Sequence, residues 1–339
     1  MSKENLYKFQ FIFIDVTLPY LERRIHLTEF YFAISLKPKV NSVNWEIVLS
    51  NLENTLKSID NSSNNSYHIL IATRDPDDLS LLVDSSKTTL VIPDFDPPTS
   101  IHDRDVDKIK TRRLIGSHLK KIAKKPFYVM FLDADDLVHK ELVDFVLSDD
   151  NCRGYTIFEG YVLDAANGEL RRKDEFNTIC GSCYVGYFHP EEMPESPYDM
   201  ECYFSEHRGH RKHVEIATQK GRQPDLVPFP SVIYIKGHDE SLESIKRKSR
   251  LEKSKTLRLV LLLSTVDTKL YVLLNRLRPI KFNEECEVAN KMLQEKFGQS
   301  TSPNLNVIIL GKRRFRFLRS RIKKYYDHLY KKVQYSKSN

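Results

Sequence analysis

The segment that most constrains the fold is Phe127–Asp136, in which six consecutive apolar residues run directly into three carboxylates. An uninterrupted apolar run of this length indicates a β-strand buried on both faces, as in a parallel sheet with helices on each side. In such sheets, ligands bind beyond the carboxyl ends of the strands, where these acids lie. In an extended chain Asp133 and Asp135 project to the same side, so both can reach one hard cation. The alternative is a strand end followed by a solvated turn and a helix N-cap, since aspartate suits both places.

Strand and helix patterns alternate around this segment. We expect strands at 9–15, 67–72 and 88–92, an irregular connection over 16–42, and helices over 45–59, about 105–124 and 142–146. Asn41 or Asn44 is available to cap the first helix. This alternation predicts a doubly wound α/β half-domain. Neither a GxGxxG nor a GxxxxGK[ST] phosphate loop occurs, so any phosphate must be held by metal and by Lys or Arg.

The second half of the chain has a different texture. We expect a hairpin from 155–164 and 169–176 around the turn 166–168, a strand with a small-residue bend over 176–185, a helix over 201–220, and a last strand at 228–235. Residues 250–278 form a leucine-rich helical pattern, and 298–304 read as a linker. The expected organisation is a main domain over 1–245, a helical extension over 246–300 and a basic amphipathic tail over 301–339.

Composition sets broad limits on the class of protein. The 339 residues are 40% hydrophobic and 29% charged, which is ordinary for a soluble globular protein. No signal peptide and no run of about 18 apolar residues is visible, and five cysteines are an odd number, so we expect reduced thiols in the cytoplasm. Cys180 and Cys183 are spaced as in zinc sites, but no second such pair occurs. We therefore expect Gly181 and Ser182 to form a tight bend, with the cysteines as small apolar fillers.

The positive charge is concentrated at the end of the chain. Residues 312–337 contain eleven Lys or Arg against one acid, a local balance of +10, whereas the whole chain carries +7. The apolar residues of this tail follow one helical stripe. Three interpretations stay open: binding to an anionic membrane surface, which we favour, docking as a terminal helix, and binding of nucleic acid, which we do not expect.

An ordered set of patches adds a family resemblance. The order strand, helix, strand, strand, basic helix and LDADD comes with five patches, at Lys110–Gly116, Phe158–Val162, Cys180–Ser182, Gly209–Arg211 and Pro228–His238. Together they resemble the GT-A nucleotide-sugar glycosyltransferases, nearest to the bacterial family 2-like group, over roughly residues 9–245. The resemblance implies a Rossmann-like GT-A fold with a mixed, mostly parallel sheet flanked by helices, followed by a C-terminal helical extension.

The same resemblance implies a metal and a donor. It implies Mn²⁺ or Mg²⁺ held by Asp133, Asp135 and His238, and a nucleotide-sugar donor, UDP-linked, whose sugar moves to a saccharide or lipid-linked acceptor in surface polysaccharide synthesis. Asp75 ends the second expected strand, where family members hydrogen-bond the nucleotide base, and Asp15 ends the first.

Other expected roles rest on chemistry and position. Lys110 and Arg113, on the basic helix, are candidates for contacting pyrophosphate or ribose, together with Asp133 on the donor side. The candidates for the general base are Glu201, Glu206 and His210, of which only His210 lies in a family-like patch.

Two features depart from the family pattern. The insertion between the first strand and the first helix is longer than is common in the group. No Glu-Asp pair stands at the head of the helix after the Gly-Ser bend, where many inverting members keep their base.

We expect a cytoplasmic protein, peripheral on the inner face of the membrane. One alternative is a nucleotidylyltransferase-like enzyme, although that class usually carries a Gly-rich loop after the first strand and the segment Asp15–Pro19 has no glycine. The other is a non-catalytic protein that binds membrane or nucleic acid through the tail. The set Asp133, Asp135 and His238 argues against this second alternative.

Overall fold

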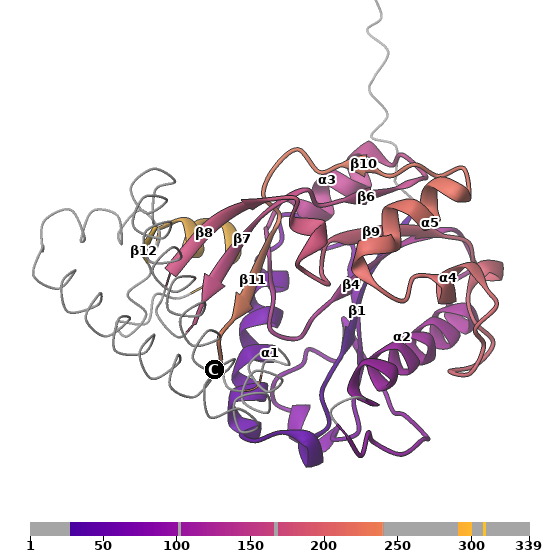
Figure 1. Cartoon of the computed structure of the whole chain (residues 1–339), viewed down its shortest axis with the longest axis horizontal. Coiled ribbons are helices and arrows are strands. Elements are labelled where there is room, and N and C mark those ends of the chain that lie inside the picture. The colour runs from indigo at the N-terminus through magenta and orange to yellow at the C-terminus, as the bar shows by residue number, and fades with distance from the viewer. Residues whose placement is uncertain are drawn as a thin grey trace, which may run out of the picture.

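Two mixed β-sheets form the framework of the chain in a computed structural model that describes residues 28–100, 103–165, 169–238, 240, 291–299 and 308–309 (Figure 1). The first sheet has seven strands in the order β10-β6-β9-β4-β1-β2-β3. Its strands are β1 (Glu29–Ser35), β2 (Tyr67–Ala72), β3 (Thr88–Val91), β4 (Phe127–Leu132), β6 (Gly154–Thr156), β9 (Tyr184–Phe188) and β10 (Asp225–Leu226). Strands β3, β2, β1 and β4 are parallel to one another, whereas β9 is antiparallel to both β4 and β6.

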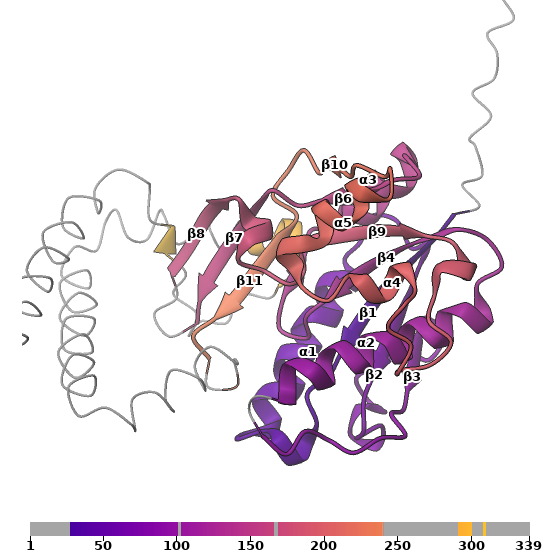
Figure 2. The ribbon, with the colours of Figure 1, turned by 45° about the vertical axis from the view of Figure 1, so that its right-hand side comes forward.

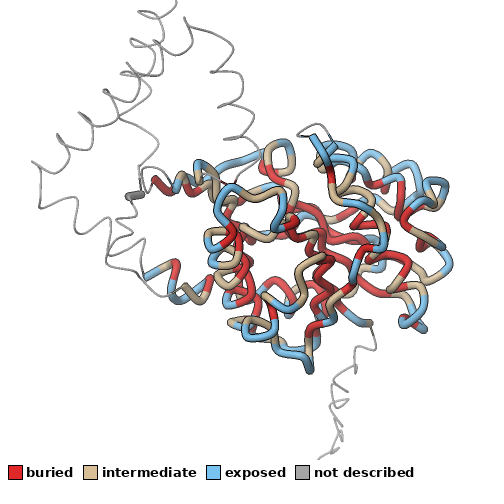
Figure 3. Tube along the Cα trace, turned by 90° about the horizontal axis from the view of Figure 1, so that it is seen from below, coloured by how far each residue is buried: buried red, intermediate tan, exposed pale blue. Residues whose placement is uncertain are grey.

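Helices cover both faces of the parallel strands. The helices are α1 (Trp45–Asp60), α2 (Asp103–Ile122), α3 (Leu142–Asp149), α4 (Tyr203–Glu206) and α5 (His213–Gln219). Side chains of β1 alternate between two apolar clusters: Phe30, Phe32 and Ile34 pack with α1 and α3, while Tyr31 and Ala33 pack with α2 and α4. The buried part of the trace therefore runs through the centre of the molecule (Figure 3). This double burial explains why the central strands are continuous apolar runs.

A second, five-stranded sheet lies beside the first, in the order β12-β8-β7-β11-β5 (Figure 2). Its strands are β5 (Leu137–Val138), β7 (Glu159–Asp164), β8 (Glu169–Asp174), β11 (Val232–Lys236) and β12 (Ile308–Ile309). Strands β7 and β8 form an antiparallel hairpin, and β11 is parallel to β7 but antiparallel to β5. Residues 291–297 are helical and bury Leu293 and Phe297 against apolar side chains of this sheet.

Most of the expected elements are confirmed. The strand at 67–72, the strand that ends before Asp133 and the helix from Trp45 all occur, and α2 begins two residues earlier than expected. The hairpin occurs as β7 and β8, but the strand expected over 155–164 is divided between β6 of the first sheet and β7 of the second. The side chain of Asn44 accepts a hydrogen bond from the backbone N–H of Ile47, so Asn44 rather than Asn41 caps α1. The fold is α/β, with a mixed, mostly parallel sheet flanked by helices.

The expectation of an irregular connection over 16–42 is wrong, because β1 lies within it. Phe30, Phe32 and Ile34 are fully buried, and the strand pairs with β2 on one side and β4 on the other. The run FYFAI is short and flanked by charged residues, but a central strand needs only a short run when both faces are covered.

Two other expectations need correction. The strand expected over 176–185 starts only at Tyr184, because the chain first forms the 3-10 turn η3 (Phe176–Thr178) and then a bend at the Gly-Ser pair. The helix expected over 201–220 is broken into α4, the 3-10 turn η5 (His210–Lys212) and α5, with Gly209 in an extended conformation between them. Extended backbone at this position cannot continue an α-helix.

Several expected elements lie outside the described residues: the strand at 9–15 with Asp15, the helix over 250–278, and the tail over 312–337. Within the part of the chain that the structure describes, no helix is both long enough and apolar enough to cross a membrane.

Two buried histidines hold the broken segment after α4 against the first sheet. Nδ1 of His207 lies 3.0 Å from Nδ1 of His213, and both rings stack on the buried ring of Tyr184. One ring must donate and the other accept, so the contact requires neutral imidazole on the accepting side. Burial lowers the pKa of His207 to about 3 and also lowers the pKa of His213.

These histidines predict a loss of stability in mild acid. Below the pKa of about 6.5 of an unfolded histidine, the unfolded chain binds a proton that folded His207 does not, so stability falls as pH falls, by about 1.4 kcal/mol per pH unit per group. His207→Phe removes one such group. We expect the pH slope of the unfolding free energy, measured by urea denaturation between about pH 6 and pH 4.5, to be smaller by about that amount in the variant. Equal slopes would contradict the buried neutral state of His207.

Candidate active site

The candidate site lies at the carboxyl ends of β1 and β4. These neighbouring parallel strands end at Ser35 and Leu132, and ligands of open α/β sheets bind in the crevice beyond the carboxyl ends of the strands. A cavity of about 940 Å³ lies there. Its wall combines the segment after β1, the first half of α2, the turn after β4, the Gly-Ser bend, η5, and the end of β11 with the residues that follow it.

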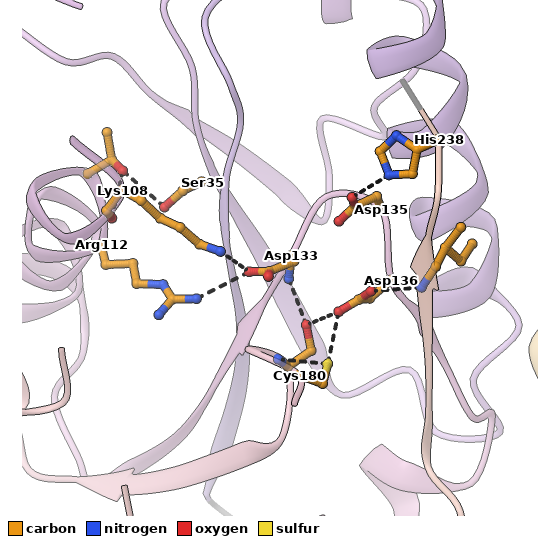
Figure 4. A network of polar contacts seen from close by, with 11 residues as sticks. Ser35, Lys108, Arg112, Asp133, Asp135, Asp136, Cys180 and His238 are labelled. Atoms are coloured by element: carbon orange, nitrogen blue, oxygen red, sulfur yellow. Dashed lines mark hydrogen bonds and ion pairs between the residues drawn. The ribbon is translucent and has the colours of Figure 1, made fainter. Parts of the chain in front are cut away.

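Asp133 is held by two cations from α2. Its Oδ1 lies 2.6 Å from Nζ of Lys108 and 3.2 Å from Nη2 of Arg112 (Figure 4). The two basic residues are four positions apart, so they share one face of the helix. Burial pushes the pKa of Asp133 upward, but Lys108 and Arg112 more than offset this, so its pKa lies below the usual value. Asp133 is therefore a carboxylate whose charge is balanced from the opposite wall.

Asp135 pairs with a histidine from the second sheet. Its Oδ2 lies 2.8 Å from Nε2 of His238, and both side chains line the cavity (Figure 4). His238 follows β11 after Gly237, whose φ of +81° lies in the region that glycine adopts readily. Nδ1 of His238 is buried and has no hydrogen-bond partner among the described residues.

The third acid of the turn, Asp136, points away from the cavity and is fully buried. Its carboxylate accepts hydrogen bonds from Ser182 Oγ at 2.6 Å, Cys180 Sγ at 3.2 Å and the backbone N–H of Ile235 at 3.3 Å. Burial, together with Asp135 and Asp133, raises its pKa. Asp136 does not cap the next helix, since Glu141 occupies the N-cap position of α3.

The Gly-Ser bend supports the same turn. Oγ of Ser182 accepts a hydrogen bond of 2.9 Å from the backbone N–H of Asp133 while it donates to Asp136. Gly181 lies against Asp133, because a Cβ at this position would stand 2.8 Å from Oδ2 of Asp133. The buried cysteines contribute to the packing, and Cys180 also donates its thiol proton to Asp136.

Glu240 ties the chain after His238 to the first sheet. The side chain of Glu240 accepts from Nζ of Lys37 at 2.6 Å and from the backbone N–H groups of Val43 and Asn44, just before α1. Only 2% of this side chain is exposed. Burial alone would raise the pKa of Glu240, but Lys37 and the two N–H groups lower it. This contact closes one end of the cavity with residues from both sheets.

His210 is the expected base candidate that lines the cavity. Its Nε2 lies 3.2 Å from the carbonyl oxygen of Thr178. Because a carbonyl only accepts, Nε2 carries the proton and Nδ1 of the neutral ring is left as the basic atom. Burial lowers the pKa of His210, which favours this neutral form. Glu201 and Glu206 are exposed and do not line the cavity.

The structure thus brings together Asp133, Asp135, His238 and His210 from the set expected from the sequence. The expected donor contacts lie elsewhere. Asp75 accepts a hydrogen bond from the backbone N–H of Lys39, and Lys110 lies over the rings of Phe95 and Tyr198.

Arg113 is also outside the cavity lining. It is buried on another face of α2, where burial and the nearby Arg208 lower its pKa.

Sequence reasoning missed the basic residues that do line the cavity or reach Asp133. These are Lys37, Arg104, Lys108, Arg112 and Arg211. A signal for two of them was present: Lys108 and Arg112 share the helical face of the buried Ile115 and Leu119, whereas Lys110 does not.

The described side chains of the cavity bring few ligands together for a metal ion. In the described ranges, no group of three or more His, Cys, Asp or Glu side chains converges as a metal site. Asp135 and His238 are a pair whose polar atoms already meet in the cavity: Nε2 of His238 lies 2.8 Å from Oδ2 of Asp135, and Nδ1 has no partner in the part of the chain that the structure describes. Carboxylate and imidazole together suit Mn²⁺ or Mg²⁺ when phosphate and water complete the shell. Asp133 is engaged by Lys108 and Arg112 instead.

Comparison with known proteins does not assign the chain: no protein-family model matches it, and no match was found among curated proteins.

The site geometry predicts different roles for two adjacent acids. Asp136→Ala leaves Ser182 Oγ and the Ile235 N–H without their buried acceptor, so we expect the unfolding free energy to fall by about 2–4 kcal/mol. Asp135→Ala removes a partly exposed contact and should cost less than about 1 kcal/mol. Urea denaturation of both variants checks this. Similar losses in the two variants would show that Asp136 does not anchor the turn.

Proposed function

We propose that this protein is a metal-dependent glycosyltransferase of the GT-A type. It moves a sugar from a nucleotide-diphosphate donor, UDP-linked, to a saccharide or lipid-linked acceptor in surface polysaccharide synthesis. The observation that carries the proposal is the meeting of Asp135 with His238 and of Asp133 with Lys108 in one cavity at the carboxyl ends of β1 and β4, with the buried Arg112 also reaching Asp133.

The donor side of the cavity has groups suited to a nucleotide diphosphate. Asp135 and His238 would hold Mn²⁺ or Mg²⁺, and such an ion, when bound, neutralises the charge gained by the leaving diphosphate. Lys108 and Arg112 supply cations opposite this pair, which supports phosphate binding without a glycine-rich loop. Asp133 pairs with both cations, so a phosphate oxygen that binds there competes with this carboxylate for them.

The acceptor side has a candidate base. A neutral His210 with its proton on Nε2 presents Nδ1 as the atom that takes a proton from an acceptor hydroxyl. The carbonyl of Thr178 keeps this tautomer.

A lipid-linked acceptor would agree with the basic residues at 312–337, which suit an anionic membrane surface, and we place the protein on the cytoplasmic face of that membrane.

The rival enzyme class differs in the bond that reacts. A nucleotidylyltransferase forms or breaks a bond at the α-phosphate, whereas a glycosyltransferase breaks the bond between sugar and diphosphate. Incubation with UDP-sugars and Mn²⁺, with and without added pyrophosphate, therefore separates the two by product. A glycosyltransferase releases UDP together with free sugar or glycoside, whereas a nucleotidylyltransferase needs the pyrophosphate and forms UTP and sugar 1-phosphate.

The proposal predicts the effect of removing either acid from the cavity. Asp135→Ala or Asp133→Ala should lower metal-dependent hydrolysis of the donor by about 100-fold or more, because Asp135 would hold the cation and Asp133 orients Lys108 and Arg112 toward the cavity. Circular dichroism and the urea midpoint should show an intact fold. Asp94→Ala, which removes an exposed acid outside the cavity, is the matched control. Unchanged turnover in the cavity variants would refute the assignment.

A further inference from the structure

The cations that line the cavity differ in their partners. Lys37 pairs with Glu240, and Lys108 pairs with Asp133. Arg211 instead donates from Nε to the carbonyl oxygen of Thr178 at 3.1 Å, and no carboxylate of the described chain pairs with it. One of its five N–H donors is thus used on a neutral acceptor, and its Nη atoms make no hydrogen bond within the described residues. Arg211 is therefore an exposed cation of the cavity lining that has no carboxylate partner within the described ranges.

Arg211 belongs to the same side of the cavity as the candidate base. His210 Nε2 and Arg211 Nε both reach the carbonyl oxygen of Thr178, at 3.2 and 3.1 Å, so one backbone atom fixes both side chains. The cavity lining also includes Asn41, from the segment after β1, and Arg104, from the first turn of α2. A group bound at Arg211 therefore lies near the hydroxyl from which His210 would take a proton.

We infer that Arg211 recognises an anionic group on the acceptor, a phosphate or a carboxylate close to the hydroxyl that receives the sugar. This inference rests on the proposed glycosyltransferase function. The planar guanidinium matches both anions by paired N–H donors, and an ionised partner makes such hydrogen bonds about twice as strong as neutral ones.

Two sources of the anion share this chemistry: the phosphate of a lipid-linked acceptor and the carboxylate of an acidic sugar. Asp135 stands in the same cavity and repels either anion until a bound cation offsets its charge. The acceptor anion is thus expected to bind best once donor nucleotide and cation are in place.

The test uses the full-length protein saturated with UDP and Mn²⁺. Three probes are titrated by calorimetry: glycerol 1-phosphate, methyl glucuronide and the uncharged methyl glucoside. We expect at least one charged probe to bind more tightly than methyl glucoside, and the better of the two identifies the source of the anion. Arg211→Met should weaken that probe at least about tenfold and leave the affinity for UDP with Mn²⁺ unchanged. Lys212→Met is the matched control, since Lys212 is an exposed cation of the same turn outside the cavity, and should bind as the wild type does.

Two results would overturn the inference directly: equal affinity of the wild type for charged and uncharged probes, or equal affinity of Arg211→Met and wild type for the charged probe. A loss of UDP affinity in Arg211→Met would also overturn it, because Arg211 would then bind the donor diphosphate. Failure of the proposed function looks different, because the wild-type protein would then not bind UDP with Mn²⁺ at all.

Discussion

The buried carboxylate of Asp136 is the interaction on which the candidate site depends. It accepts hydrogen bonds from the Gly-Ser bend through Ser182 and Cys180, and from the second sheet through the N–H of Ile235. Burying a carboxylate away from water costs free energy unless hydrogen-bond donors replace the water, and the Asp136 carboxylate has three such donors. These hydrogen bonds fix the turn after β4 to the Gly-Ser bend and to β11. The other two acids of the turn, Asp133 and Asp135, line the cavity.

From this anchor, the rest of the cavity is assembled by elements far apart in sequence. Helix α2 places Lys108 and Arg112 against Asp133, and β11 delivers His238 to Asp135. Glu240 then accepts hydrogen bonds from Lys37 and from the N–H groups ahead of α1. These contacts join the segment after β11 of the second sheet to the segment after β1 of the first. Most of these acids and cations are paired with one another. A charged substrate that binds in the cavity must therefore replace one member of such a pair.

The sequence predicts the parts of this arrangement that depend on local pattern. Strands buried on both faces are continuous apolar runs, which identified β4 and β2, and the Asp133 and Asp135 pair follows from the end of such a run. The same pattern did not identify β1, because the apolar run at 9–14 was assigned as the first strand and the run at 30–34 was left in the connection that follows it. On α2, the candidates chosen from the sequence, Lys110 and Arg113, lie outside the cavity lining, whereas Lys108 and Arg112 contact Asp133. The contact between Lys37 and Glu240 spans about 200 residues and leaves no local signal.

The central claim is that a cation held at Asp135 and His238 joins the protein to a nucleotide diphosphate. Calorimetric titration of the wild-type protein with UDP, in Mn²⁺ and in EDTA, tests it most directly. The account predicts binding that requires Mn²⁺ and is lost in His238→Ala, with the fold of the variant intact. Equal UDP affinity in Mn²⁺ and EDTA, or no binding of UDP under either condition, would contradict it.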